Sequence, residues 1–278
     1  MAKNEEETSV IKLGGVEVLT PQERRKRLSL LLWGKSGSGK TTLAATAPGR
    51  KLWINFDPDG TDVLTSRDDI EVLDFAPKPD RVVEQFKEDD PLRITRYLEQ
   101  NPAVETIVFD SLTTFGNKAL SHGIMVAKTT KKGKYTTIED PGFAGYGNKN
   151  TWTRLAIAKI LKATGTVQRN IIFIAHEDKP VFDREGNVVS ISIMLGSALN
   201  EQVPIEFGEV WNLSDTGKER RIAIRNCRMR APVKSRMFLT NGEPEFKWTY
   251  DSIEDEGEGI TDWYKKWMNN NGKKIELP

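Results

Sequence analysis

The segment Gly34–Thr41 constrains the fold more than any other part of this sequence. It reads Gly-Lys-Ser-Gly-Ser-Gly-Lys-Thr and satisfies the pattern G-x-x-x-x-G-K-[ST] at every fixed position. The apolar run LSLLLW precedes it, and the helix-compatible run TTLAATA follows. A strand, a glycine-rich turn and a helix in this order predict an α/β protein assembled from strand–helix units.

Each fixed position of this segment has a chemical reason. Glycines let successive backbone N–H groups point inward at a phosphate, and these groups open onto a helix N-terminus that favours an anion. Lys40 is expected to reach the β- and γ-phosphates, and the Thr41 hydroxyl is placed to ligate Mg²⁺. We therefore predict that ATP and Mg²⁺ bind here, with the nucleotide held by Gly34, Lys35, Ser36, Gly37, Ser38, Gly39, Lys40, Thr41 and Thr42.

A second acidic position supports this prediction. The run Thr106–Phe109 is mostly apolar and ends in Asp110. An aspartate at the carboxyl end of a buried strand near the phosphate loop would hold Mg²⁺ through water, as in the Walker-B arrangement. The alternative is that Asp110 caps the next helix, which Ser111 could also do. We favour the metal role.

Hydrolysis needs a group that orients water, and Asp57 is the first candidate. It ends the predicted strand KLWINF, next to the Walker strand, where its carboxylate would face the crevice above the strand ends. Asp59 is the fallback, and a simple Asp-Pro-Asp-Gly turn is an equal alternative. His176 ends the strand IIFIA and could sense the γ-phosphate, although an ordinary structural role is equally compatible. The predicted catalytic set is Lys40, Asp57, Asp110 and His176.

Apolar runs alternate with helical segments from Leu28 onward. Strands are predicted at KLWINF, IEVLDF, TIVFD and NIIFIA, an amphipathic helix at TWTRLAIAKILKAT, and later strands at VVSISIM, EVWNL, RRIAIRN and EFKWTY. This pattern predicts a mostly parallel central sheet with helices on both faces and a β-rich C-terminal extension. We divide the chain into a flexible N-terminal arm (1–24), a P-loop ATPase domain (25–250), and an acidic linker with a short terminal helix (251–278).

Composition limits the classes of protein to which this chain can belong. The 278 residues carry a net charge of +1, so no global basic field indicates nucleic acid. No run approaches the ~18 apolar residues of a membrane span, and the acidic start MAKNEEETSV lacks the apolar core of a signal peptide. Cys227 is the only cysteine, which excludes an internal disulfide. We therefore expect a cytoplasmic protein without a membrane partner.

Two groups of basic residues are candidates for other contacts. The segment 128–149 is basic and glycine-rich and is predicted to be a mobile loop, in which cations could track a single-stranded DNA backbone while aromatic rings stack on bases. An ordinary flexible loop is the alternative. The DNA-binding candidates are Lys131, Lys132, Lys134, Tyr135 and Tyr146. The candidates for a positive charge that acts on a neighbouring subunit's nucleotide are Arg225, Arg228, Arg230, Lys234 and Arg236.

From about Leu28 to Arg236 the sequence resembles the RecA-like recombinase core, most closely the phage-type RecA-like ATPases that work with single-strand annealing. The resemblance is carried by GKSGSGKTT, WINFDPDGTDVL, IVFDS, IIFIAHE and VKSR. It implies a RecA-like P-loop core, ATP hydrolysis at the boundaries of a homo-oligomer, single-stranded DNA as partner, and a host cytoplasm if phage-encoded. By position it places Asp57 where these proteins usually carry a catalytic glutamate, His176 at the γ-phosphate sensor, and Lys234 and Arg236 near a neighbour's nucleotide.

The leading hypothesis is a DNA-stimulated ATPase in recombination or annealing. One alternative is a small-molecule or nucleotide kinase, which shares the P-loop but should carry an Arg-rich helical lid. Another is a nucleotide-gated scaffold with little turnover. An AAA+ motor is disfavoured because no helical lid pattern follows the core.

Overall fold

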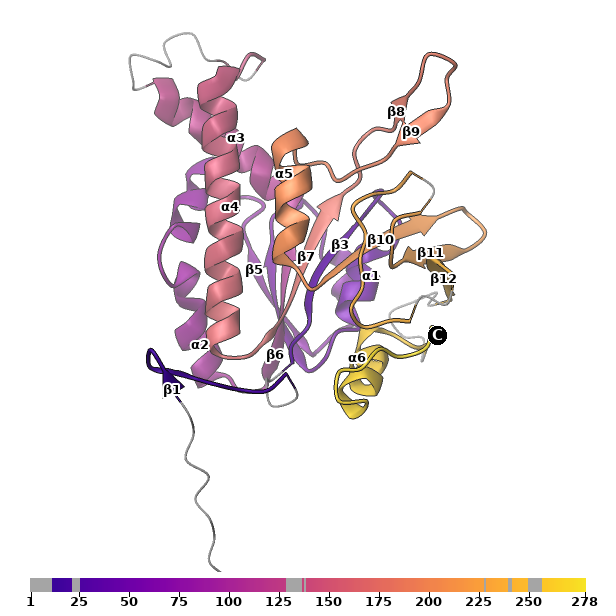
Figure 1. Ribbon diagram of the computed structural model, residues 1–278. Coiled ribbons are helices and arrows are strands. Elements are labelled where there is room, and N and C mark those ends of the chain that lie inside the picture. The colour runs from indigo at the N-terminus through magenta and orange to yellow at the C-terminus, as the bar shows by residue number, and fades with distance from the viewer. Residues whose placement is uncertain are drawn as a thin grey trace, which may run out of the picture.

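An eight-stranded sheet organises the chain (Figure 1). The computed structural model describes residues 12–21, 26–128, 137, 139–227, 229–239, 242–249 and 257–278. The sheet order is β12-β11-β10-β3-β7-β6-β4-β5. Neighbouring strands from β10 to β5 run parallel, whereas β11 and β12 are antiparallel. The strands span Ser29–Gly34 (β3), Arg50–Asn55 (β4), Ile70–Asp74 (β5), Val104–Asp110 (β6), Asn170–His176 (β7), Glu209–Asp215 (β10), Arg220–Ala223 (β11) and Glu245–Trp248 (β12).

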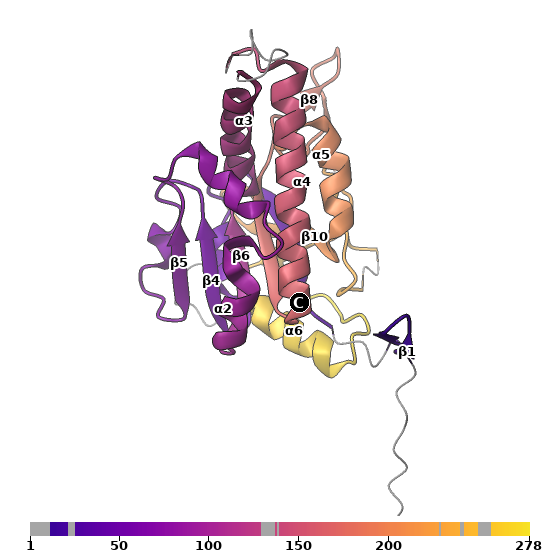
Figure 2. The same cartoon turned by 90° about the vertical axis from the view of Figure 1, so that its left-hand side faces the viewer.

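Helices cover both faces of the sheet, which explains why its central strands are continuous apolar runs. One face packs against α2 (Ile94–Gln100), α3 (Leu112–Lys128) and α4 (Gly142–Thr166), with short 3₁₀ turns at 80–86 and 91–93 (Figure 2). The other face packs against α1 (Lys40–Ala45) and α6 (Ile260–Asn269). The short helix α5 (Ser197–Gln202) lies beside α4 and continues into a 3₁₀ turn at 203–206.

The predicted fold class is confirmed: an α/β P-loop core with a mostly parallel sheet, helices on both faces and antiparallel C-terminal strands. The strand KLWINF lies next to TIVFD, as expected, because β4 pairs with β6. Two details differ from the predicted β-rich extension. The strand β10 is parallel to β3 and so belongs to the core. The segment VVSISIM does not join the sheet, and part of it forms a separate hairpin, β8 (Val181–Phe182) with β9 (Val188–Ser190).

The prediction of an irregular loop over 128–149 is wrong for its second half. The helix α4 begins at Gly142, well before the predicted helix at TWTRLAIAKILKAT. Gly142 and Gly147 lie within this helix without breaking it, and a β-carbon on either would meet nothing within 4 Å. A β-carbon on Gly123 of α3 would lie 2.8 Å from the β-carbon of Asn148 in α4, so the two helices approach closely only because the side chain is missing. Residues 129–136 and 138 lie outside the described residues.

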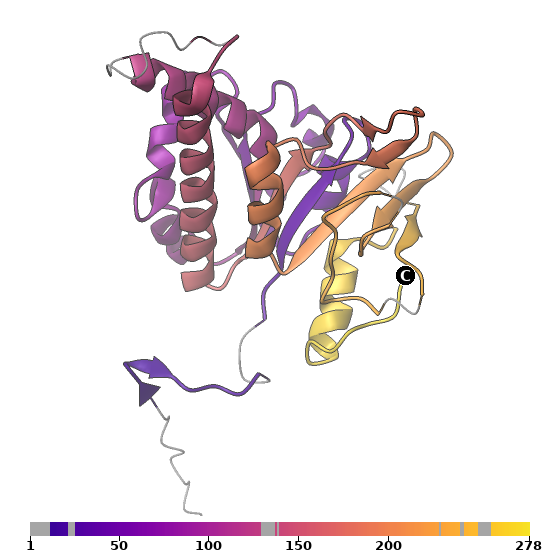
Figure 3. The same ribbon diagram turned by 45° about the horizontal axis from the view of Figure 1, so that its top comes forward.

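The two ends of the described chain pack differently. Residues 12–21 form a small hairpin, β1 (Lys12–Leu13) with β2 (Val16–Glu17), which stands apart from the sheet and exposes Leu13 and Val16 (Figure 3). The terminal helix α6 instead buries Trp263 against the sheet. Its first turn bonds to the end of α1, since the Ile260 N–H donates to the Thr46 hydroxyl at 2.9 Å and the Thr261 hydroxyl donates to the Thr46 carbonyl at 2.6 Å. Within the described ranges, no helix is long and apolar enough to cross a bilayer.

Candidate functional site

The glycine-rich segment forms the predicted turn between β3 and α1. Gly37 and Gly39 have φ angles of 77° and 94°, in the left-handed region that favours glycine. Gly34 has a different constraint, because a β-carbon there would lie 2.1 Å from the carbonyl oxygen of Leu213 in β10. The fixed glycines of the motif therefore serve both the curl of the backbone and the packing of the next strand.

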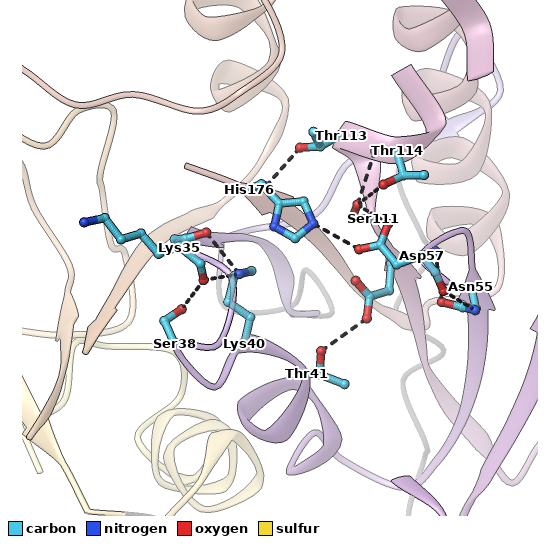
Figure 4. Close-up of polar contacts among 12 residues, drawn as sticks. Lys35, Ser38, Lys40, Thr41, Asn55, Asp57, Ser111, Thr113, Thr114 and His176 are labelled. Atoms are coloured by element: carbon cyan, nitrogen blue, oxygen red, sulfur yellow. Dashed lines mark hydrogen bonds and ion pairs between the residues drawn. The ribbon is translucent and has the colours of Figure 1, made fainter. Parts of the chain in front are cut away.

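Lys40 lies in the floor of this turn (Figure 4). Its Nζ donates to the carbonyl oxygens of Lys35 at 2.6 Å and Gly34 at 3.0 Å, and the residue is only 6% exposed. Burial lowers the pKa of Lys40 to about 8, although Asp110, Asp57 and Glu177 act in the opposite direction. The ammonium group is thus held by the backbone of the same loop that would surround a phosphate.

Thr41 and Asp110 converge from α1 and β6. The Thr41 hydroxyl lies 3.4 Å from Asp110 Oδ2, and the indole N–H of Trp53 donates to the same oxygen at 3.3 Å. Burial, together with the nearby Asp57 charge, raises the pKa of Asp110 to about 7. A hydroxyl and a carboxylate that meet in this way are ligands suited to Mg²⁺, and a cation would favour the ionised carboxylate.

Ser111 settles how the helix after Asp110 is capped. The Thr114 N–H donates to the Ser111 hydroxyl at 3.2 Å, so the capping contact of α3 comes from Ser111 and leaves the Asp110 carboxylate facing Thr41. The peptide bond between Asp110 and Ser111 is cis.

Asp57 and His176 form a pair beside this site. His176 Nε2 lies 3.0 Å from Asp57 Oδ2, and the Ser111 hydroxyl donates to Asp57 Oδ1 at 2.8 Å (Figure 4). Burial raises the pKa of Asp57, but hydrogen bonds from His176, Thr114 and Ser111 outweigh it and hold the pKa below its ordinary value. The backbone N–H of His176 donates to the Thr113 hydroxyl at 2.9 Å, which ties the end of β7 to α3. The result is an ionised carboxylate beside an imidazole.

The fallback residue Asp59 lies away from this cluster. It is exposed, has a φ of 54°, and its carbonyl accepts the Asp62 N–H at 3.3 Å. The Gly60 N–H donates to the Asp57 carbonyl at 3.2 Å, so Asp57–Gly60 is a turn. Asp59 therefore serves the turn, whereas the Asp57 side chain faces the site.

Two residues of the site were not predicted from the sequence. Glu177 directly follows His176, is 7% exposed, and has one carboxylate oxygen that finds no hydrogen-bond donor among the described residues. Its charge acts on Lys40. Trp53, which bonds Asp110, was hidden inside an apolar strand. Glu177 could have been predicted because it is an acidic residue at the end of a strand. The contact between the Trp53 indole and Asp110 could not, because it depends on which strands pair.

The comparisons with known proteins agree with a P-loop core. Residues 26–246 match the family described as an AAA domain. The chain belongs to this AAA domain family. This match was not expected, because the sequence shows no helical lid pattern after the core. Among the described residues that follow β10, the regular elements are the strands β11 and β12 and the helix α6.

Other matches are remote or missing. A solved structure titled "Crystal structure of the RadB recombinase" aligns at 13% identity over 73% of this chain and 83% of that chain, with a TM-score of 0.38. That likeness is too weak to bear on the function of this AAA domain protein. No curated protein matches the sequence.

Among the predicted trans-acting basic residues that the structure describes, Lys234 and Arg236 do not lie at the P-loop of the same chain. Lys234 bridges to Val210, and the Arg236 N–H donates to Glu209 at 2.7 Å. Glu209 pairs with Leu30, so Lys234 and Arg236 lie near the start of β3, whereas the P-loop follows the end of β3. Arg225 donates to the Gly242 carbonyl at 3.0 Å.

The remaining candidates are placed as follows. Arg230 lies in an isolated bridge with Cys227 and with Ile191, and Tyr146 is exposed on α4. Lys131, Lys132, Lys134, Tyr135 and Arg228 lie outside the described residues.

Proposed function

We propose that this AAA domain protein binds ATP and Mg²⁺ on Gly34–Thr42, hydrolyses the ATP, and acts on single-stranded DNA in phage-type recombination or annealing as a homo-oligomer. One observation carries the proposal. Three groups from separate parts of the chain meet at one edge of the sheet: Lys40 with Thr41, the Asp110 carboxylate, and the Asp57–His176 pair. A phosphate loop, a magnesium ligand and an ionised carboxylate are the parts that P-loop hydrolysis requires.

The chain's own groups would act as follows. Lys40 transfers its hydrogen bonds from the loop carbonyls to the β- and γ-phosphate oxygens. Thr41 would hold Mg²⁺ directly and Asp110 would hold it through water, and the ion would supply positive charge to the phosphates. Asp57 orients the attacking water: a carboxylate has about four acceptor sites, and His176, Ser111 and Thr114 use three of them. His176 lies between this carboxylate and the P-loop strand, so its other ring nitrogen is available to the γ-phosphate.

Two variants separate binding from hydrolysis. Lys40→Ala should abolish uptake of a labelled ATP analogue. Asp57→Ala should keep that uptake and slow ATP turnover by roughly 10²–10⁴-fold, the usual contribution of a positioned acid or base. Asp59→Ala is the matched control, since Asp59 is exposed and lies two positions further along the same turn, and it should change neither quantity. Unchanged turnover in Asp57→Ala would remove the water-orienting role.

The DNA part of the proposal is supported by exposed aromatic side chains. Phe143 and Tyr146 on α4 are 101% and 52% exposed, and Phe182 on the β8–β9 hairpin is 57% exposed. Figure 1 shows that the α3–α4 hairpin and the β8–β9 hairpin both project beyond the edge of the sheet where β7 ends. Exposed aromatic rings are the usual stacking platforms for single-stranded bases. The same edge carries the P-loop, so bound DNA and bound nucleotide could affect each other.

The ATPase rate with and without single-stranded DNA, on one preparation, tests this part. We expect stimulation by DNA, and an affinity for DNA that falls with salt by a slope of roughly 0.7 per phosphate contacted. Tyr146→Ala and Phe182→Ala should each weaken DNA binding, as should joint replacement of Lys131, Lys132 and Lys134 by alanine, with basal turnover intact. A phosphorylated small acceptor with no response to DNA would show a kinase instead.

A further inference from the structure

Glu177 is a buried carboxylate that the proposed hydrolysis does not use. It directly follows His176, the last residue of β7, and is only 7% exposed. Its Oε1 atom is buried and has no hydrogen-bond donor among the described residues. A buried acceptor without a donor destabilises a fold, so a carboxylate in this position calls for a reason other than stability.

The backbone holds Glu177 in place on two sides. Its N–H donates to the Gly34 carbonyl, at the end of β3, at 3.0 Å, and the residue also forms an antiparallel bridge with Ile193. The Asp178 N–H extends that bridge by donating to the Ser192 carbonyl at 2.8 Å. Glu177 is therefore fixed beside the start of the P-loop.

Glu177 and Lys40 meet at the same carbonyl oxygen. Lys40 Nζ donates at 3.0 Å to the Gly34 carbonyl, which also accepts the Glu177 N–H. Burial lowers the pKa of Lys40, and the charges of Asp110, Asp57 and Glu177 act in the opposite direction. The Glu177 carboxylate thus lies within electrostatic reach of the ammonium group that is expected to bind the phosphates.

The other two carboxylates near Lys40 have partners of their own. Asp57 Oδ2 lies 3.0 Å from His176 Nε2. Asp110 Oδ2 accepts the Trp53 indole N–H at 3.3 Å, and this carboxylate is also the proposed ligand of Mg²⁺ through water. No such partner for Glu177 Oε1 is found in the described part of the chain, so its negative charge acts on whatever occupies the P-loop.

We propose that the Glu177 carboxylate is a counter-charge to Lys40 in the empty P-loop and that it weakens the binding of nucleotide phosphates there. It repels the negative charge of the phosphates, and the repulsion grows with the number of phosphate charges near Lys40. The same repulsion favours the release of ADP after hydrolysis. The inference rests on the proposed binding of ATP at the P-loop, and it adds a residue that limits the affinity of that site.

Three variants at this one position test the role. Competition against a labelled ATP analogue in magnesium buffer gives the affinities for Mg–ATP and Mg–ADP. Glu177→Gln removes the charge and keeps the shape, so it should bind Mg–ATP roughly tenfold more tightly and Mg–ADP more tightly by a smaller factor. Glu177→Met, which is also uncharged and of similar length, should show the same gain. Glu177→Asp keeps the charge and should stay close to the parent.

Two controls separate a local charge from a change in net charge. Glu201→Gln, at an exposed position of α5, removes the same charge and should change neither affinity. The gain in Glu177→Gln should persist in 1 M salt, because buried charges are screened much less than exposed ones. Urea unfolding shows whether each variant is folded, and Glu177→Gln should be at least as stable as the parent, because a neutral amide costs less to bury than a charge.

The outcomes distinguish this inference from the proposed function. If the unaltered protein binds neither nucleotide, the proposed function fails and the inference fails with it. If it binds Mg–ATP, and both uncharged variants bind Mg–ATP equally or more weakly, the Glu177 charge does not oppose the phosphates; the inference is then wrong and P-loop binding stands. An equal gain in Glu177→Asp would assign the effect to the space around the side chain instead of its charge, and would also overturn the inference.

Discussion

The same substitution at two glycines of α3 should have opposite effects on stability. Gly116 and Gly123 are two helical turns apart, so both face α4. A β-carbon on Gly123 would lie 2.8 Å from the β-carbon of Asn148 and 3.4 Å from the Gly145 carbonyl oxygen, both of which are fixed by the backbone of α4. A β-carbon on Gly116 would meet only the flexible end of Lys149, at 3.3 Å, and the Thr153 hydroxyl at 3.9 Å.

The magnitudes follow from two competing terms. Replacing a helical glycine by alanine favours folding by up to ~1 kcal/mol at either position. At Gly123 the two helices must separate, which costs about 1–3 kcal/mol as for other overpacked sites. The shift also strains the hydrogen bond that Asn148 Nδ2 donates to the Gly123 carbonyl at 3.1 Å. We expect Gly123→Ala to lose about 1 kcal/mol of unfolding free energy and Gly116→Ala to gain about 0.5 kcal/mol.

Urea unfolding of the three proteins, with the slope of each transition compared, measures both changes. Each variant is the control for the other, because the residue types and the helix are identical. The close-packing explanation for the glycines would be refuted if Gly123→Ala were as stable as the parent, or if both variants lost equal stability.

Two further predictions concern buried charges. Asp69→Asn should cost about 3 kcal/mol by urea unfolding, because it leaves the ammonium of Lys51, only 3% exposed, without its carboxylate partner. Although burial raises the pKa of Asp69, hydrogen bonds from Arg67 and Lys51 hold it well below its ordinary value. The stabilisation is therefore present above the ordinary aspartate pKa of about 4 and should fade as the pH falls below it. If the difference in unfolding free energy between parent and variant persisted at acid pH, the Asp69–Lys51 ion pair would not be its cause. Trp53→Phe removes the indole donor to Asp110 and should raise the Mg²⁺ concentration needed for half-maximal ATP binding about tenfold, whereas an unchanged Mg²⁺ requirement would show that the indole contact does not support the metal site.

The P-loop and the parallel sheet could be predicted from the sequence because local sequence patterns determine both. The motif at Gly34–Thr41 has fixed spacing, and strands covered on two faces are apolar throughout. The pairing of β4 with β6 followed from the same logic, and with it the position of Asp57 near Asp110.

The prediction from the sequence was wrong for a glycine-rich segment that forms a helix. Residues 142–147 were predicted to be part of a glycine-rich mobile loop, yet they form the first turns of α4. In the structure this segment packs closely against Gly123 of α3, and no local pattern reveals that contact. The bond from Trp53 to Asp110 was missed because it arises from a contact between strands distant in the sequence. Glu177 was missed although an acidic residue at a strand end is a local signal.

The bond between α6 and Thr46 has a consequence for the order in which the protein is made. Ile260 and Thr46 are 214 positions apart in the chain. At a synthesis rate of about 5–20 residues per second, the phosphate loop leaves the ribosome roughly 10–40 seconds before the helix that closes over its neighbour α1. The phosphate-loop segment of a growing chain is therefore synthesised long before the helix α6 that packs beside it. A fragment ending at residue 246, where the family match stops, would lack α6 altogether.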